Sequence, residues 1–123
     1  MKNGKIEKYT KLSNKYINDA DILLKKGDLS QTSEKLWGAF AAIVKAVAAK
    51  HKKKEIKTHD GISFYLASIS KELKDESLLT ADLTANALHQ YFYEDSLTVE
   101  FVRKGSKTIK QFITRMRNRF DLN

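Results

Sequence analysis

Residues 29–50 read LSQTSEKLWGAFAAIVKAVAAK, and the class of fold can be inferred from this segment. Its large apolar residues recur at helical spacing, and alanines occupy most of the remaining circumference. These large residues are Leu36, Trp37, Phe40, Ile43, Val44 and Val47. A helix that is apolar nearly all round is buried, so we expect it to be the central element. Trp37 and Phe40 are predicted to be its main packing anchors, and Gly38 would let a neighbouring helix approach closely.

The same periodicity predicts four further helices, over residues 6–26, 61–74, 80–94 and 98–120. Gly27 is expected to end the first, Asp28 with Gln31 to cap the second, and Thr80 to cap the fourth. The fourth helix has a core seam of Ala81, Ala85, Leu88 and Phe92. Short connections favour antiparallel neighbours. The prediction is an all-α, antiparallel up-and-down bundle of about five helices.

The composition agrees with one small domain, residues 1–123, because a second core would leave too little apolar surface for either. Proline and cysteine are absent, which excludes disulfides and thiolate metal sites. The polar N-terminus lacks the apolar segment of a signal peptide, and no apolar run is long enough to span a membrane. A cytoplasmic protein is therefore expected.

The net charge of +8 favours association with phosphate-rich polymers, although lysine is also the usual residue of solvated helix faces. Candidate phosphate contacts are Lys52, Lys53 and Lys54, in the basic connection 51–58, and Arg103 in the fifth helix. The other basic residues of that helix are left mostly for solvent or a partner. The aromatic residues occupy core-like positions, so no exposed stacking platform is expected.

A polar stripe flanks the core seam of the fourth helix, one position further round: Asp82, Asn86, His89 and Tyr93. A histidine at such a boundary can be held by packing while its imidazole reaches a ligand or another subunit. The alternative is a partly buried histidine that is hydrogen-bonded within the bundle. His51 and His59 lie in or beside the basic connection without a second ligand at metal-binding spacing, so we expect neither a metal nor a cofactor.

Two segments resemble a known family. Residues 33–39, SEKLWGA, are similar to the second-helix signature of the archaeal PaREP proteins, and residues 88–94, LHQYFYE, to their Leu-His-x-x-Phe-Tyr-Glu segment. Those proteins resemble in turn the HEPN superfamily of helical bundles, which are named for nucleotide binding and commonly form dimers. Many HEPN proteins are metal-independent ribonucleases or toxin components paired with a small nucleotidyltransferase.

The resemblance implies an active motif of Arg, four to six residues, His, and often a Tyr two residues later. His89 and Tyr91 match the His-x-Tyr part, and Asn86 matches the polar residue between Arg and His. The Arg is missing: Thr84 stands five residues before His89, and residues 75–93 contain neither Arg nor Lys. Loss of a positioned donor of this kind commonly costs on the order of 10² to 10³ in rate.

We therefore expect a homodimeric, HEPN-like nucleotide- or RNA-binding bundle without ribonuclease activity, in which Asn86, His89 and Tyr93 line the ligand site. One alternative is a divergent metal-independent ribonuclease that uses His89 and Tyr91 with a basic residue from elsewhere, such as Arg103. Another is a helical partner subunit of a separately encoded nucleotidyltransferase.

Overall fold

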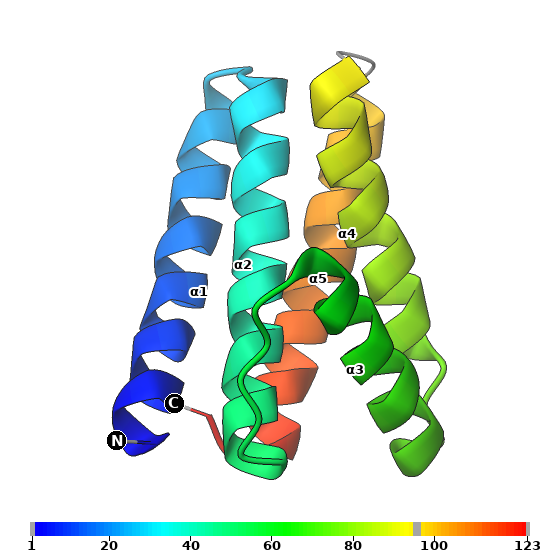
Figure 1. The fold of residues 1–123 in the computed structure, drawn as a ribbon. Helices are drawn as coiled ribbons and strands as arrows, with labels where there is room; N and C mark the ends of the chain where they lie inside the picture. The colour runs from blue at the N-terminus through cyan, green and yellow to red at the C-terminus, as the bar shows by residue number, and fades with distance from the viewer. Residues whose placement is uncertain (1, 95–96, 123) are drawn as a thin grey trace.

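The computed structural model describes residues 2–94 and 97–122, with the side chains of residues 2, 3 and 92–94 outside the description. Its helices are α1 (Lys2–Lys25), α2 (Leu29–His51), α3 (His59–Leu73), α4 (Ser77–Glu94) and α5 (Val99–Arg119). Figure 1 shows the four long helices running up and down side by side. The all-α, five-helix bundle predicted from the sequence is confirmed. Within the described residues, no helix combines the length and apolarity that crossing a membrane requires.

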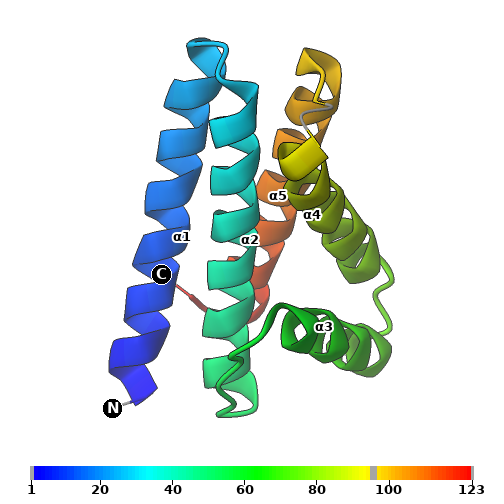
Figure 2. The same ribbon diagram turned by 45° about the horizontal axis from the view of Figure 1, so that its top comes forward.

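Helix α2 is the central element, as predicted, because it packs against each of the other four helices. Helix α1 lies antiparallel along it, and α4 and α5 form a second antiparallel pair beside it (Figure 1). The shorter α3 lies at a wide angle to α1 and α2, next to α4 (Figure 2). The connection 52–58 runs back alongside α2 from its C-terminal end, so the start of α3 lies midway along the bundle (Figure 1).

The turn between α1 and α2 forms as the sequence predicts. Gly27 has a φ of 80°, the left-handed conformation that glycine adopts without strain. The N–H of Asp28 donates to the carbonyl of Leu23 over 3.0 Å, and the N–H of Lys26 donates to the same carbonyl over 3.1 Å, which satisfies a carbonyl at the end of α1. The Asp28 side chain then accepts from the N–H of Gln31 at 3.1 Å and caps α2. A short turn with both helix ends capped places α1 against α2.

The core is built on α2. Phe40 is fully buried, and its ring lies 5.2 Å from that of Phe112 on α5. A Cβ atom at Gly38 would lie 3.0 Å from the Tyr16 ring, so glycine permits the close approach of α1 that was expected. The prediction for Trp37 is wrong in part: this ring is only partly buried, because its position on α2 lies at the edge of the core.

The fourth helix begins at Ser77, three residues before the predicted cap Thr80. The reason is Asp75, whose Oδ1 accepts from the Ser77 N–H at 3.0 Å and from the Ser77 hydroxyl at 2.5 Å. The other carboxylate oxygen of Asp75 accepts from Arg115 of α5 at 2.5 Å. The predicted seam residues Ala81, Ala85 and Leu88 are buried, and Phe92 lies outside the described side chains.

Replacement of Asp75 by alanine is expected to destabilise the protein by about 1 to 2 kcal/mol at neutral pH, the usual cost of losing a helix cap. The hydroxyl of Ser77, together with Arg115, holds the pKa of Asp75 below its usual range. The stabilisation is therefore present above about pH 4 and is lost as the pH falls through the lowered pKa of the folded state. Urea unfolding at pH 7, 5 and 3 would measure it, and an equal difference between the two proteins at all three values would contradict this role.

Most basic residues of α5 are exposed, as expected, but some of them also bind other helices of the bundle. Lys110 donates to Asp21 of α1 at 2.6 Å, and Arg117 donates to Asn14 of α1 at 2.7 Å. These contacts join α5 to α1 across a large separation in sequence, which the pattern along one helix cannot reveal. Arg103 is exposed, as predicted.

Candidate functional site

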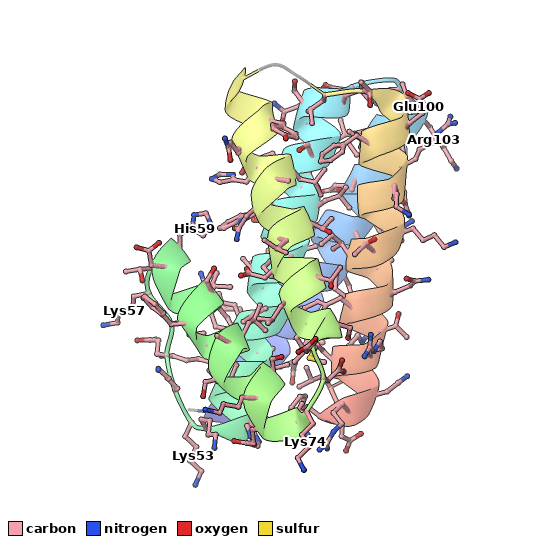
Figure 3. All side chains as sticks on the ribbon, turned by 90° about the vertical axis from the view of Figure 1, so that its right-hand side faces the viewer. Lys53, Lys57, His59, Lys74, Glu100 and Arg103 are labelled. Atoms are coloured by element: carbon pink, nitrogen blue, oxygen red, sulfur yellow. The ribbon has the colours of Figure 1, made fainter. Side chains whose placement is uncertain are left out.

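Three aromatic rings from three different helices meet on one side of the bundle. The rings of Trp37 (α2) and His89 (α4) are stacked, with centroids 4.7 Å apart and planes at 26°. His59, the first residue of α3, meets the Trp37 ring edge-on at 5.0 Å and the His89 ring at 5.3 Å. Figure 3 shows His59 at the edge of the molecule, where α3 begins beside α4. We call Trp37, His59 and His89 the ring cluster.

A polar network on α4 orients His59. Its Nε2 donates to the side-chain oxygen of Asn86 at 2.7 Å, since that amide oxygen can only accept. The amide nitrogen of Asn86 donates to Asp82 at 3.2 Å, and the same carboxylate oxygen accepts from the Ser63 hydroxyl of α3 at 3.2 Å. These bonds fix the start of α3 against α4. They also leave the His59 ring exposed at the surface.

A carboxylate from α2 accompanies His89. Glu34 Oε1 lies 3.5 Å from His89 Nδ1, an ion-pair distance if the imidazole is protonated. The other oxygen, Glu34 Oε2, and the Trp37 indole N–H are buried without a hydrogen-bond partner among the described residues. A buried polar atom without a partner costs about 1 to 3 kcal/mol. Such atoms are uncommon in folded proteins and call for an explanation, so an acceptor and a donor beside the ring cluster suggest a place for a ligand group.

The connection before α3 determines where His59 lies. The Thr58 hydroxyl accepts from the Gly61 N–H at 3.0 Å and caps the helix, so helical structure starts at His59. Ile56 is buried and ties the connection to the core. A Cβ atom at Gly61 would lie 3.0 Å from Ile56, so glycine allows the connection to fold tightly at this point.

The structure brings together two of the residues predicted for the ligand site. His89 and Asn86 both lie at the boundary of the core, as their stripe on α4 indicated; His89 is part of the ring cluster, and Asn86 contacts it through His59. The ring of Tyr91 instead lies 5.2 Å from Phe101 of α5, because residues two apart on a helix point in different directions. The Tyr93 side chain lies outside the described residues.

The predicted phosphate contacts lie away from the ring cluster. Lys53 is at the lower end of the molecule in Figure 3, far from His59. Its neighbour Lys52 forms an ion pair with Glu72 at 2.9 Å, and Lys54 is exposed. Arg103 lies on the opposite side of α4 from His59 in Figure 3. Within one chain, Arg103 therefore does not replace the missing motif arginine.

Thr84, which stands at the position of that arginine, donates its hydroxyl to the carbonyl of Thr80 at 2.9 Å. This bond stays within α4 and points to no role in binding an anion. The site consequently holds histidines and a carboxylate, and the charge that could stabilise a phosphate must come from protonated imidazole or from lysines of neighbouring elements.

His59 is the functional candidate that the sequence analysis passed over. The sequence holds one signal for it, the run Thr58-His59-Asp60-Gly61, in which a capping threonine precedes a histidine at a helix start. Nothing in that run indicates which helix the imidazole will meet. No group of three or more His, Asp or Glu side chains suited to a metal ion occurs among residues whose placement is described.

Two imidazoles that lie side by side, each with a side-chain partner, can exchange protons with a bound molecule and donate hydrogen bonds to phosphate oxygens. The stacked indole makes the ring cluster partly apolar. None of the curated proteins matches this chain significantly. The model of the archaeal PaREP1/PaREP8 family, by contrast, matches residues 8–113. Since this match covers most of the 123 residues, the chain belongs to the archaeal PaREP1/PaREP8 family.

Proposed function

We propose that the protein is an RNA- or nucleotide-binding bundle of HEPN-like type that holds a nucleotide at the ring cluster and does not cleave it. The observation that carries this proposal is the convergence of Trp37, His59 and His89 from three helices, within 5.3 Å of one another. Stacking of a base on an aromatic side chain is worth about 1 to 3 kcal/mol, and it tolerates any sequence because every base has a π face.

The absence of cleavage follows from the charge that the reaction needs. Attack of a 2′-hydroxyl on a phosphodiester builds negative charge on the phosphorane, which a positioned guanidinium stabilises through paired donors. Residues 75–93 hold no Arg or Lys, and the Thr84 hydroxyl bonds within its own helix. Binding requires only that phosphate and base find partners, which the imidazoles and the Trp37 ring offer.

A second candidate function, a divergent metal-independent ribonuclease, is favoured by the pairing of His59 with His89 at 5.3 Å. One imidazole would take the proton of the 2′-hydroxyl as that oxygen attacks phosphorus, and the other, protonated, would give a proton to the departing 5′-oxygen. The products would be a 2′,3′-cyclic phosphate and a free 5′-hydroxyl. Asn86 would hold one imidazole in place and Glu34 the other.

Labelled single-stranded RNA incubated with purified protein and a chelator distinguishes these two functions. We expect RNA that is retained by the protein and stays intact over hours. Cleavage that survives the chelator and is lost in both His59→Ala and His89→Ala would replace the binding proposal with the ribonuclease. RNA that is neither retained nor cut would remove both and leave the partner-subunit hypothesis.

The homodimer and the pairing with a nucleotidyltransferase stay predictions. The side chains that such a partner could cover include Phe64 on α3 and Leu83 on α4, which are 76% and 72% exposed. They follow Ser63 and Asp82 in sequence, and the hydrogen bond between those two residues joins α3 to α4. Sedimentation of the purified chain would test the dimer, and a monomer at every micromolar concentration would contradict it.

A further inference from the structure

Helices α1 and α2 share a surface in which lysine side chains rest against tyrosine rings. It comprises Lys8, Tyr9, Lys15, Tyr16, Lys35 and Lys45, and we call it the lysine–tyrosine seam. Because α1 and α2 run antiparallel, Lys35 near the start of α2 meets Tyr16, and Lys45 further along α2 meets Tyr9. No part of the ring cluster belongs to the seam.

Each tyrosine ring has two ammonium groups near it. Lys15 and Lys35 lie 5.9 and 5.0 Å from the centre of the Tyr16 ring. Lys8 and Lys45 lie 6.0 and 5.8 Å from the centre of the Tyr9 ring. A cation against a ring is weakly attracted to it, by about 0.5 to 1 kcal/mol at an exposed site.

The lysines of the seam are largely free of acidic partners. Lys15 pairs with Asp19 at 3.0 Å, whereas Lys8, Lys35 and Lys45 form no ion pair with a described residue. This distinguishes them from lysines elsewhere in the bundle that are neutralised, such as Lys52 and Lys110. A cation that is preorganised on a ring and has no counter-charge loses less side-chain freedom when it binds an anion.

The seam adjoins the ring cluster through a single turn of α2. Trp37, which stacks on His89, is followed directly by Gly38, against which the Tyr16 ring packs. The end of the seam at Tyr16 and the ring cluster therefore contact the same turn of α2. The seam extends from there along α1 for about 10 Å, the rise of the seven residues between its two tyrosines.

We propose that the lysine–tyrosine seam binds the phosphate backbone of single-stranded RNA whose terminal or adjacent nucleotide occupies the ring cluster. The inference rests on the proposed function, and it adds the route of the chain outside the site. Phosphates would contact the four ammonium groups without regard to sequence, and such contacts make affinity fall with salt. A free mononucleotide would use the ring cluster alone and gain little from the seam.

The test is the double variant Lys35→Gln/Lys45→Gln, measured by anisotropy with a fluorescein-labelled oligouridylate of about ten nucleotides, a length within known single-strand site sizes. Each lost phosphate contact should reduce the slope of log affinity against log salt by about 0.7. We expect the slope to drop by about 1.4, and the affinity at 0.1 M salt to fall roughly 10- to 30-fold. Thermal unfolding of the variant should stay within a few degrees of the wild type, because both lysines are half-buried and each loses only a ring contact worth about 0.5 to 1 kcal/mol.

Lys71→Gln/Lys74→Gln removes the same charge from α3 and is the matched control. Lys74 lies at the end of α3 away from His59 (Figure 3), so the slope should stay at the wild-type value. An equal drop in both double variants, or no drop in either, would overturn the role of the seam. If His59→Ala weakens binding while the seam variant does not, the inference falls and the proposed function stands; if wild-type protein binds no RNA, both fall.

Discussion

Replacement of Phe40 by alanine should lower the free energy of unfolding by about 3 to 5 kcal/mol, the usual range for a buried phenylalanine. Phe40 is fully buried on α2 and packs against Phe112, so the deletion leaves a cavity between the two helices. Domains of this size are stable by about 5 to 15 kcal/mol in total. Urea unfolding followed by circular dichroism measures the change.

Phe64→Ala is the matched control, since it is the same substitution at a side chain that is 76% exposed. Its cost should stay within about 0.5 kcal/mol of zero. Comparable losses at the two positions would mean that α2 is not the centre of the core. A loss at Phe64 alone would place an interface on α3 that stabilises the folded chain.

Removal of both histidines of the ring cluster, His59→Ala/His89→Ala, should weaken the binding of single-stranded RNA by roughly 10- to 100-fold. A hydrogen bond contributes a net of about 0.5 to 1.5 kcal/mol, so two imidazoles that each lose one to phosphate give a change of this size. Competition binding with labelled RNA at fixed salt measures the effect. His59→Ala alone should account for part of the loss at a small cost in stability, because the imidazole is exposed and its bond to Asn86 is one of several that hold α3 against α4.

His51→Ala is the control with identical chemistry. His51 lies at the other end of α2, 2.7 Å from Glu72, with its ring 5.2 Å from that of Phe120. It should leave RNA affinity within about two-fold of the wild type. Equal losses at His51 and at the ring cluster would indicate binding through total positive charge and not through a defined site.

The helices could be predicted from the sequence where a single segment carries the signal. The alanine-rich segment around Phe40 is apolar on nearly every side, so its burial could be predicted. Gly27 adopts a positive φ, as expected for a glycine that ends a helix. The start of α4 was misplaced because Thr80 is a good capping residue by type. Asp75 caps the start of the helix instead. Asp75 also accepts a hydrogen bond from Arg115 on α5, and a contact with another helix cannot be read from the local sequence.

Only part of the candidate site could be predicted from the sequence. Asn86 and His89 could be inferred from their stripe beside the core seam, since periodicity on one helix fixes which side chains share a face. His59 could not, because its position depends on how the connection 52–58 folds over the buried Ile56. Trp37 was assigned to the core because an almost wholly apolar helix does not reveal which ring lies at its edge.

Charge pairing was the least predictable feature. Lys110 with Asp21 joins α5 to α1, and Arg115 with Asp75 joins α5 to the connection before α4; these ion pairs depend on the tertiary arrangement. Basic residues that look free on a helical wheel are therefore partly neutralised. The lysines that remain without a described acidic partner beside the site lie on α1 and α2, on which the proposed RNA path is built.

Trp37 is the only tryptophan in the chain, so its fluorescence reports on the ring cluster alone. The most direct measurement is a titration of wild-type protein with single-stranded RNA in which Trp37 emission and RNA anisotropy are followed together. The account predicts a saturable change in emission with the same midpoint as the anisotropy, because a nucleotide at the cluster alters the surroundings of the indole. RNA that binds by anisotropy while Trp37 emission stays constant would show that the RNA binds elsewhere, and would contradict the assignment of the ring cluster as the binding site.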